Sequence, residues 1–307
     1  MPTPRSARAV ATGLAAAGLA GLTWGVAVER HWFALRRLVL PLLPAGAEPV
    51  TVLHLSDLHL TPGQDRKVAW LRRLGDLRPD LVVSTGDNVA QAEALPALAH
   101  ALEPLLDRPG GFVFGSNDLY SARWTSPHRY LGGTTSGSRR QHQRLPTTAL
   151  RALLSGGGWS FLEGRRVVVE LNGSRIELRG CGDAHLGLDT NYAAVAGPPD
   201  PTVDLALGVA HAPYRRVLDA MTADGVGLIL AGHTHGGQVC LPGYGALTTN
   251  SDLDRRQAKG LSSHRWAGRQ SQLHVSAGLG TSPFAPYRFA CRPEASLLAL
   301  VPSDALG

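Results

Sequence analysis

The sequence contains few cysteines, and their arrangement excludes several classes of protein. Its 307 residues include only Cys181, Cys240 and Cys291, and none of them belongs to a C-x-x-C pair. Three cysteines cannot cross-link a chain of this size. A disulfide scaffold and a cysteine-rich zinc module are therefore both excluded.

The sequence also lacks the signature motifs of two common enzyme classes. Neither G-x-x-x-x-G-K-[ST] nor G-x-S-x-G occurs, which argues against a P-loop NTPase and a serine hydrolase. Lysine occurs only at Lys67 and Lys259, although the formal net charge is +6. The excess of arginine is explained either by GC-rich coding or by attraction to anionic partners. Because no run of five basic residues occurs, we expect no nucleic-acid binding.

One long segment near the start of the chain carries no charge. As a helix, the twenty residues 9–28 would be about 30 Å long, which matches the hydrocarbon thickness of a bilayer. We predict a transmembrane or signal-anchor segment over residues 1–28, which would attach the protein to a membrane. A cleaved secretory signal and a helix packed on the domain are the alternatives. Residues 29–49 contain three prolines and are predicted to be a linker.

From residue 50 onward, apolar runs alternate with segments of helical periodicity. We expect buried strands over 50–56, 80–85, 111–115, 203–210 and 226–231, with helices over 64–77, 92–106 and 214–222. Asn172-Gly173 predicts a hairpin within 161–180. This order indicates an α/β fold with a mixed sheet and one domain over residues 50–301. The basic insertion 119–146 is either a substrate-recognition lid or a solvated loop.

Polar side chains suited to metal binding follow five of the expected strands. Because ligands of open α/β sheets bind beyond the carboxyl ends of the strands, we expect these side chains to converge. Carboxylate, amide and imidazole donors without thiolate suit a pair of borderline divalent ions. One ion would be held by Asp57, His59 and His235, and the other by Asn117, His211 and His233, with Asp87 shared between them.

This ordered set of motifs resembles the calcineurin-like metallophosphoesterases. The segment 232–239 (GHTHGGQV), with the apolar N-terminal segment, looks like the membrane-associated bacterial branch of that family. The resemblance implies a four-layer α-β-β-α sandwich with mixed sheets and a location at the bacterial cell membrane, or export after cleavage. It also implies phosphodiester or phosphomonoester hydrolysis by a hydroxide bound to two ions, which would be Mn²⁺, Fe²⁺/Fe³⁺ or Zn²⁺. Asp87, Asn117 and His211 would then be catalytic residues as well as metal ligands.

One position departs from the family pattern. Many members have histidine after the metal-binding asparagine, whereas this chain has Asp118. That histidine is usually assigned to the leaving group, so Asp118 would take over its catalytic role only with a raised pKa or through a water. His54 is expected in the core, and Asp183 and His185 are expected not to bind the metals.

Two other functions remain open at this stage. The first is a phosphodiesterase or pyrophosphatase acting on phospholipids or on lipid-linked nucleotide head groups, which the apolar segment 9–28 favours. The second is a metal-stabilised binding scaffold without catalysis.

Overall fold

The computed structural model describes residues 4–121 and 143–305, and its framework consists of two six-stranded mixed sheets. The first sheet has the order β1-β14-β2-β3-β4-β5, in which β14 pairs antiparallel with β2 and the other neighbours are parallel. Its strands are β1 (Ala34–Leu43), β2 (Val50–Leu55), β3 (Leu81–Ser84), β4 (Gly110–Phe112), β5 (Trp159–Phe161) and β14 (Glu294–Pro302).

The second sheet has the order β12-β13-β9-β8-β7-β6, with antiparallel pairs at both edges and parallel strands in the middle. The predicted hairpin is confirmed, because Asn172 and Gly173 connect β6 and β7 with φ angles of 49° and 81°. The strands are β6 (Arg166–Leu171), β7 (Ser174–Gly180), β8 (Leu205–Val209), β9 (Leu228–Ala231), β12 (Gly260–Trp266) and β13 (Arg269–Val275); a separate ribbon is formed by β10 (Cys240–Leu241) and β11 (Gly245–Ala246).

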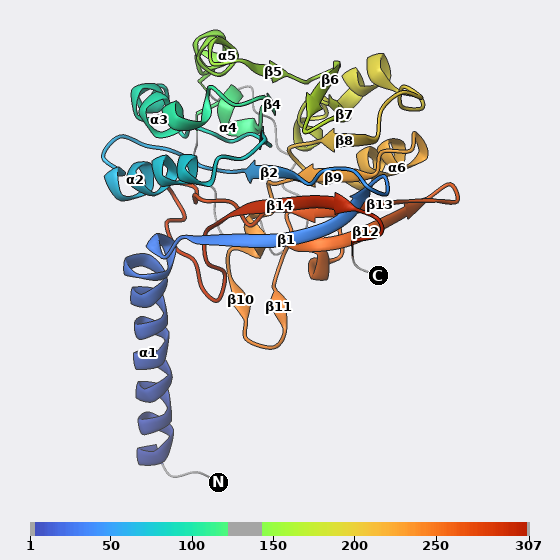
Figure 1. The fold of residues 1–307 in the computed structure, drawn as a ribbon. Helices are drawn as coiled ribbons and strands as arrows, with labels where there is room; N and C mark the ends of the chain where they lie inside the picture. Colours follow the sequence, from blue (N-terminus) through green and yellow to red (C-terminus); the bar gives the residue numbers. More distant parts are fainter. Residues whose placement is uncertain (1–3, 122–142, 306–307) are drawn as a thin grey trace.

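Helices cover the outer faces of both sheets, so the fold has the expected four layers (Figure 1). Three apolar cores lie between the layers: one under the helices of each outer layer and one between the sheets. Along β2, Val50 and Val52 face the second sheet, whereas Leu53 and Leu55 face the helices, so the strand is apolar on both faces. The helices are α2 (Asp65–Arg73), α3 (Leu95–Leu102) and α5 (Thr147–Gly156) on the first sheet, α6 (Arg215–Ala223) on the second, and α4 (Ser116–Leu119), a single turn after β4.

The linker predicted over residues 29–49 is wrong for its central part. Residues Ala34–Leu43 form β1, an edge strand that pairs in parallel with β14 over its whole length. Leu40 and Leu43 are buried in the core between the sheets. Pro41 is tolerated because an edge strand does not need every backbone N–H for pairing.

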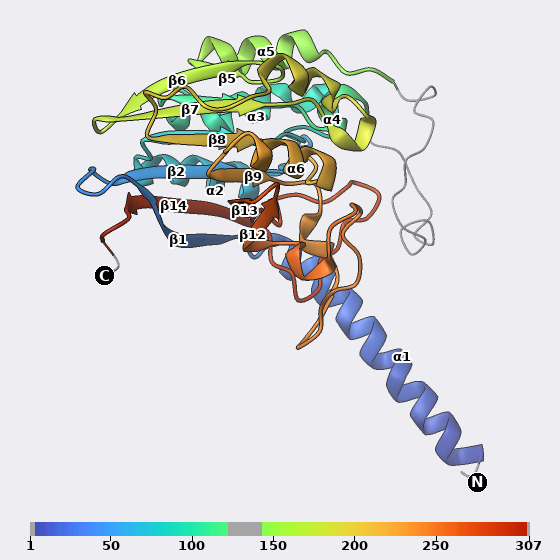
Figure 2. The same ribbon diagram turned by 90° about the vertical axis from the view of Figure 1, so that its right-hand side faces the viewer.

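Helix α1 (Pro4–Ala27) projects away from the sheets in both views (Figure 1; Figure 2). Its last turns contact the loop before β14, where the backbone N–H of Arg288 donates to the carbonyl oxygen of Gly25 at 3.2 Å. Over the described part of the chain, no helix combines the length and apolar character that crossing a membrane requires. The transmembrane segment expected over residues 1–28 stays a prediction.

Candidate metal centre

The predicted metal ligands follow the carboxyl ends of parallel strands from both sheets. Asp57 and His59 follow β2, Asp87 follows β3, and Asn117 lies in α4 after β4. From the second sheet, His211 follows β8, and His233 and His235 follow β9. The two sheets therefore contribute to one rim, as the position of these residues after the strands predicts.

The backbone at this rim is strained. A positive φ is uncommon for residues other than glycine, and such strain is concentrated at functional sites. Five of the seven predicted ligands nevertheless have φ between 41° and 67°: Asp57, His59, Asp87, His233 and His235.

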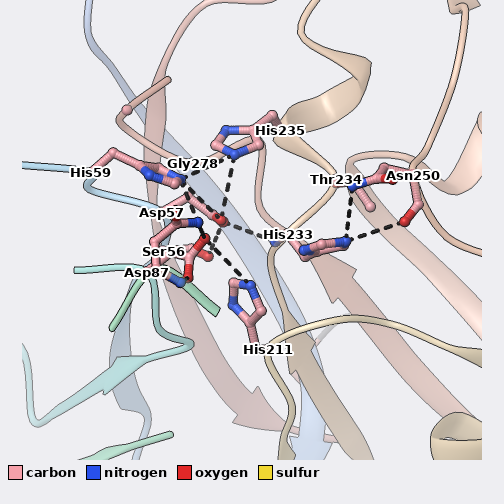
Figure 3. Close-up of polar contacts among 12 residues, drawn as sticks. Ser56, Asp57, His59, Asp87, His211, His233, Thr234, His235, Asn250 and Gly278 are labelled. Atoms are coloured by element: carbon pink, nitrogen blue, oxygen red, sulfur yellow. Dashed lines mark hydrogen bonds and ion pairs between the residues drawn. The ribbon is translucent and has the colours of Figure 1, made fainter. Parts of the chain in front are cut away.

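Two groups of donor atoms are close enough together for each to hold a metal ion (Figure 3). The first contains Asp57, His59 and His235, in which the two Nε2 atoms are 3.2 Å apart. The second contains Asp57, Asp87 and His211. The Oδ2 atom of Asp87 is 3.4 Å from Nε2 of His59 and 3.6 Å from Nε2 of His211. Asp57 is common to both groups, and Asp87 of the second group also faces His59 of the first, so the two groups adjoin; the role of Asp87 as the shared ligand stays a prediction.

Unsatisfied polar atoms in this cluster fit bound metal ions. Among the described residues, Oδ1 of Asp57 and Nε2 of His211 are buried without a hydrogen-bond partner. Nδ1 of His211 is 2.8 Å from the carbonyl oxygen of Thr85, which can only accept, so Nδ1 carries a proton. The Nε2 atom that faces Asp87 is then the metal-binding atom of the neutral ring.

The pKa shifts keep the first group ready to bind a metal. Burial lowers the pKa of His59 to about 4, although the Asp87 carboxylate opposes this shift. Burial and the neighbouring His59 also hold the pKa of His235 well below its usual value. Both rings are therefore neutral at pH 7 and offer lone pairs. Burial acts to raise the pKa of Asp87, but His211, His59 and the hydrogen bonds from Asn117 outweigh it, so the pKa is lowered.

We expect metal affinity to increase with pH because of His211. Burial lowers the pKa of this ring, but the carboxylates of Asp87, Asp183 and Asp57 outweigh it and raise the pKa to about 9. A metal must displace this proton, so Mn²⁺ affinity should rise by up to about tenfold per pH unit below pH 9. The stability that this proton gives to the metal-free fold is complete below about pH 6.5 and lost as the pH rises through 9.

Calorimetric titration of the metal-free protein with Mn²⁺ at pH 6.5, 7.5 and 8.5 measures this effect. His264 is a suitable control. Its Nε2 is 2.7 Å from Oδ1 of Asp219, and it is not one of the predicted metal ligands. His264→Asn should keep the pH dependence of the wild type. An affinity that is constant over this range would contradict a protonated His211.

Two predicted ligands are placed differently from the others. Nε2 of His233 is 3.2 Å from the carbonyl oxygen of Asn250, so only Nδ1 of this ring remains for a metal. The ring lies beside His211 and His185, with centroid separations of 5.1 Å and 4.5 Å. Asn117 donates to Asp87 from its backbone and its side chain, both at 2.7 Å. His233 is part of neither group, and metal binding by His233 and Asn117 stays a prediction.

Asp118 is held by backbone N–H groups beside Asp87. Its Oδ1 accepts the backbone N–H of Asn88 at 2.7 Å, and its Oδ2 accepts those of Asp87 at 2.7 Å and Gly115 at 3.1 Å. The side chain is fully buried and fixes the loop that carries Asp87. Burial, then the charge of Asp87, raises the pKa of Asp118 to about 7, while these N–H donors oppose the rise. This geometry indicates a positioning role for Asp118, and the catalytic role expected for it stays a prediction.

The Asp118→Asn variant should therefore lose stability. Its amide NH₂ would face backbone N–H groups, which leaves buried donors unsatisfied and costs about 2 kcal/mol of unfolding free energy. Urea unfolding of the metal-free protein measures this loss, with exposed Asp107→Asn as the control. Unchanged stability, combined with loss of one limb of the pH–rate profile, would instead indicate a proton-transfer role.

A chain of buried polar side chains supports Asp57 from behind. Ser56 Oγ donates to Asp57 Oδ2 at 2.5 Å and is 2.6 Å from Thr85 Oγ1. Thr85 Oγ1 is 3.0 Å from Nε2 of His54, whose Nδ1 is 2.9 Å from Nδ1 of His274. His54 is thus a hydrogen-bonded core residue, as predicted, and Asp183 and His185 belong to neither donor group.

Sequence reasoning missed the importance of Arg288. This fully buried side chain donates to five carbonyl oxygens and has its Nη2 atom 3.5 Å from Nδ1 of His235. The carbonyl groups belong to His235, Ala277, Gly278, Gly280 and Cys291. The available signal in the sequence was the glycine- and proline-rich segment before Arg288. A loop that follows a strand of the sheet at this point of the chain borders the same rim as the metal ligands. Arg123, His128 and Arg129 of the basic insertion lie outside the described residues.

The fold and this rim of carboxylates and imidazoles define a metal-dependent hydrolase. The sequence profile of the calcineurin-like phosphoesterases matches residues 50–237, and the chain belongs to that family. It is a hydrolase acting on phosphoester bonds, and its family uses divalent metals.

Curated relatives match almost the whole chain. The uncharacterized metallophosphoesterase YkuE of Bacillus subtilis is 26% identical and aligned over 84% of this chain and 82% of its own. The phosphodiesterase YaeI of Escherichia coli is 27% identical, over 89% and 90% respectively. Among solved structures, a 5'-nucleotidase precursor from Thermus thermophilus has a TM-score of 0.41 and 14% identity, with 83% of this chain and 54% of that chain covered.

Proposed function

We propose that this phosphoesterase hydrolyses phosphodiesters at the surface of a bacterial cell membrane. The observation that carries the proposal is the adjacency of the two donor groups, which share Asp57 and in which Asp87 Oδ2 is 3.4 Å from Nε2 of His59 and 3.6 Å from Nε2 of His211. The diester preference is supported by the relative YaeI, which is named a phosphodiesterase.

The donor set suits two Mn²⁺, Fe²⁺/Fe³⁺ or Zn²⁺ ions. Bound there, two such ions would lower the pKa of a coordinated water and polarise the phosphoryl oxygens. Asp57 and Asp87 are anionic, and His59 and His235 are neutral, so two divalent ions leave a net positive site. Arg288 adds a further positive charge beside His235. This charge balance favours a phosphoester anion as substrate.

Hydrolysis of two chromogenic esters tests the proposal. We expect the Mn²⁺-loaded protein to hydrolyse bis(4-nitrophenyl) phosphate with a higher kcat/KM than 4-nitrophenyl phosphate. A chelator should abolish both activities. A preference for the monoester would contradict the diester assignment, and metal binding without turnover of either ester would favour a scaffold.

Membrane attachment through residues 9–28 is the second part of the proposal. It is supported by the uncharged sequence and by the exposed side chains of Leu19 and Leu22 on the projecting helix α1. Fractionation of cells, followed by mass spectrometry of the intact chain, tests it. An intact chain in the membrane fraction is expected, whereas a soluble chain that lacks residues 1–28 would indicate cleavage and export.

A lipid-linked phosphoester is the alternative substrate, favoured by the same apolar helix. Comparison of a phospholipid in vesicles with the soluble nitrophenyl diester distinguishes the two. Turnover of the phospholipid at a higher kcat/KM would favour the lipid-directed activity.

A further inference from the structure

Two adjoining pockets lie where α1 meets the domain. The first has a volume of about 400 Å³ and is lined largely by polar residues, including Arg30, Arg66 and Lys67. The second has a volume of about 470 Å³ and is lined mainly by apolar residues of the α1 end, including Trp24 and Trp32. His31 and Arg66 line both pockets, so the two form one site with a polar part and an apolar part.

The polar pocket carries an excess of positive charge. Within residues 4–121 and 143–305, no carboxylate lies within ion-pair distance of Arg30, Arg66 or Lys67. Lys67 is only 7% exposed, and its Nζ donates to the carbonyl oxygen of Leu58 at 2.8 Å. Nε of Arg30 is 2.9 Å from His31, which adds no compensating charge. Burial lowers the pKa of Lys67 to about 7, and the carboxylate of Asp65 also lines the pocket, so an anion there would compensate chiefly the charges of Arg30 and Arg66.

The start of helix α2 adds to the attraction for an anion. Gln64, Asp65 and Arg66, at the N-terminus of this nine-residue helix, line the polar pocket. Gln64 provides no side-chain cap here, although its carbonyl oxygen accepts the N–H of Lys67 at 2.9 Å, so the N–H groups of Asp65 and Arg66 are the ones that face the pocket end of the helix. These N–H groups and the helix dipole favour a phosphate-type ligand, and arginine matches phosphate oxygens in bidentate geometry.

The apolar pocket leads from the polar one toward the projecting helix. Its side chains are unusually exposed for their size: Trp24 is 43% exposed, Val28 is 42% and Trp32 is 50%. The rings of Trp24 and Trp32 meet edge to face at 6.2 Å, and the guanidinium of Arg292 lies 4.0 Å from the centre of the Trp32 ring. Tryptophan beside arginine, next to exposed apolar side chains, is typical of the boundary between lipid head groups and acyl chains.

We propose that this two-part site binds an anionic phospholipid, with the phosphate in the polar pocket and an acyl chain against Trp24, Val28 and Trp32. The chain would continue along α1 past Leu22 and Leu19, which are also exposed. The site uses none of the predicted metal ligands, but it adjoins the metal centre through the loop that carries His59. A bound lipid would thereby hold the catalytic rim close to the membrane surface.

Titration of the full chain in a maltoside detergent tests this site separately from catalysis. The protein is kept metal-free with a chelator, and binding is followed by calorimetry. The probes are monomeric dihexanoyl phosphatidylglycerol, dihexanoyl phosphatidylcholine and inorganic phosphate. We expect the anionic lipid to bind at least about tenfold more tightly than the zwitterionic lipid or phosphate alone.

Charge-reversed and truncated variants locate the binding. Arg66→Glu should weaken binding of the anionic lipid at least about tenfold. Arg73 is exposed on the same helix and lies outside both pockets, so Arg73→Glu should change the affinity less than about twofold. Trp32→Ala should weaken binding of this lipid severalfold. Trp266 is also exposed, and Trp266→Ala should leave the affinity unchanged.

Three outcomes would overturn the proposal. Equal binding of both lipids would exclude recognition of the anionic charge. Phosphate that binds as tightly as the lipid would make this a phosphate site only. Equal effects of Arg66→Glu and Arg73→Glu would place the lipid elsewhere. Because the metal is absent throughout, a failure here leaves the proposed phosphodiesterase activity untouched.

Discussion

Asp87→Ala is expected to lower kcat for the nitrophenyl diester at least about 1,000-fold, equivalent to about 4 kcal/mol of activation free energy. Asp87 Oδ2 is a donor of the second group and also faces His59 of the first, so its loss removes a ligand and leaves His211 Nε2 and His59 Nε2 without a neighbouring carboxylate. The variant also loses the acceptor of both Asn117 hydrogen bonds. The predicted loss should therefore be accompanied by a lower metal content, measured on the purified protein.

Asp107→Ala is the control for this experiment, because Asp107 is an exposed aspartate whose nearest cationic partner is Arg108 at 3.8 Å. It should keep wild-type kcat and metal content. If Asp87→Ala retained more than about a tenth of wild-type kcat with full metal content, Asp87 would not be the shared ligand.

Arg288→Lys is expected to lower the free energy of unfolding by about 3 kcal/mol and to weaken metal binding. A lysine ammonium carries a charge, but it cannot reproduce the planar fork that reaches five carbonyl oxygens. Several buried carbonyl groups then lack a donor, which is costly in a low-dielectric interior. One of these carbonyls belongs to His235, so the change should also loosen a metal ligand.

Urea unfolding and Mn²⁺ titration of the same samples separate the two effects. Arg215→Lys, exposed on α6, is the matched control and should change neither quantity. An Arg288→Lys protein with wild-type stability and wild-type Mn²⁺ affinity would show that these carbonyl contacts contribute little.

The site could be predicted largely because each polar motif follows a buried strand. Apolar runs such as that of β2 fix the strands, and parallel strands bring their carboxyl ends to one rim. Asp57, His59, Asp87, His211 and His235 were therefore placed together from the sequence, and the structure confirms their proximity.

Other features depend on contacts between distant parts of the chain. β1 forms because it pairs with β14, some 260 residues later in the chain. The three prolines in and after this segment made it resemble a linker in the sequence. The position of Asp118 depends on the backbone N–H groups of the loop after β3, which no local pattern reveals. The contact of His233 Nε2 with the carbonyl oxygen of Asn250 is likewise not revealed by a local sequence pattern. Arg288 was unrecognised because its partners are backbone carbonyls, which have no residue-type signature.

The most direct test of a two-metal phosphoesterase is a titration of the metal-free full chain with Mn²⁺ while bis(4-nitrophenyl) phosphate hydrolysis is recorded. We expect no hydrolysis without metal and a plateau of activity at two equivalents of Mn²⁺ per chain. Full hydrolysis in the presence of excess chelator, or saturation with two ions and no hydrolysis, would contradict this expectation.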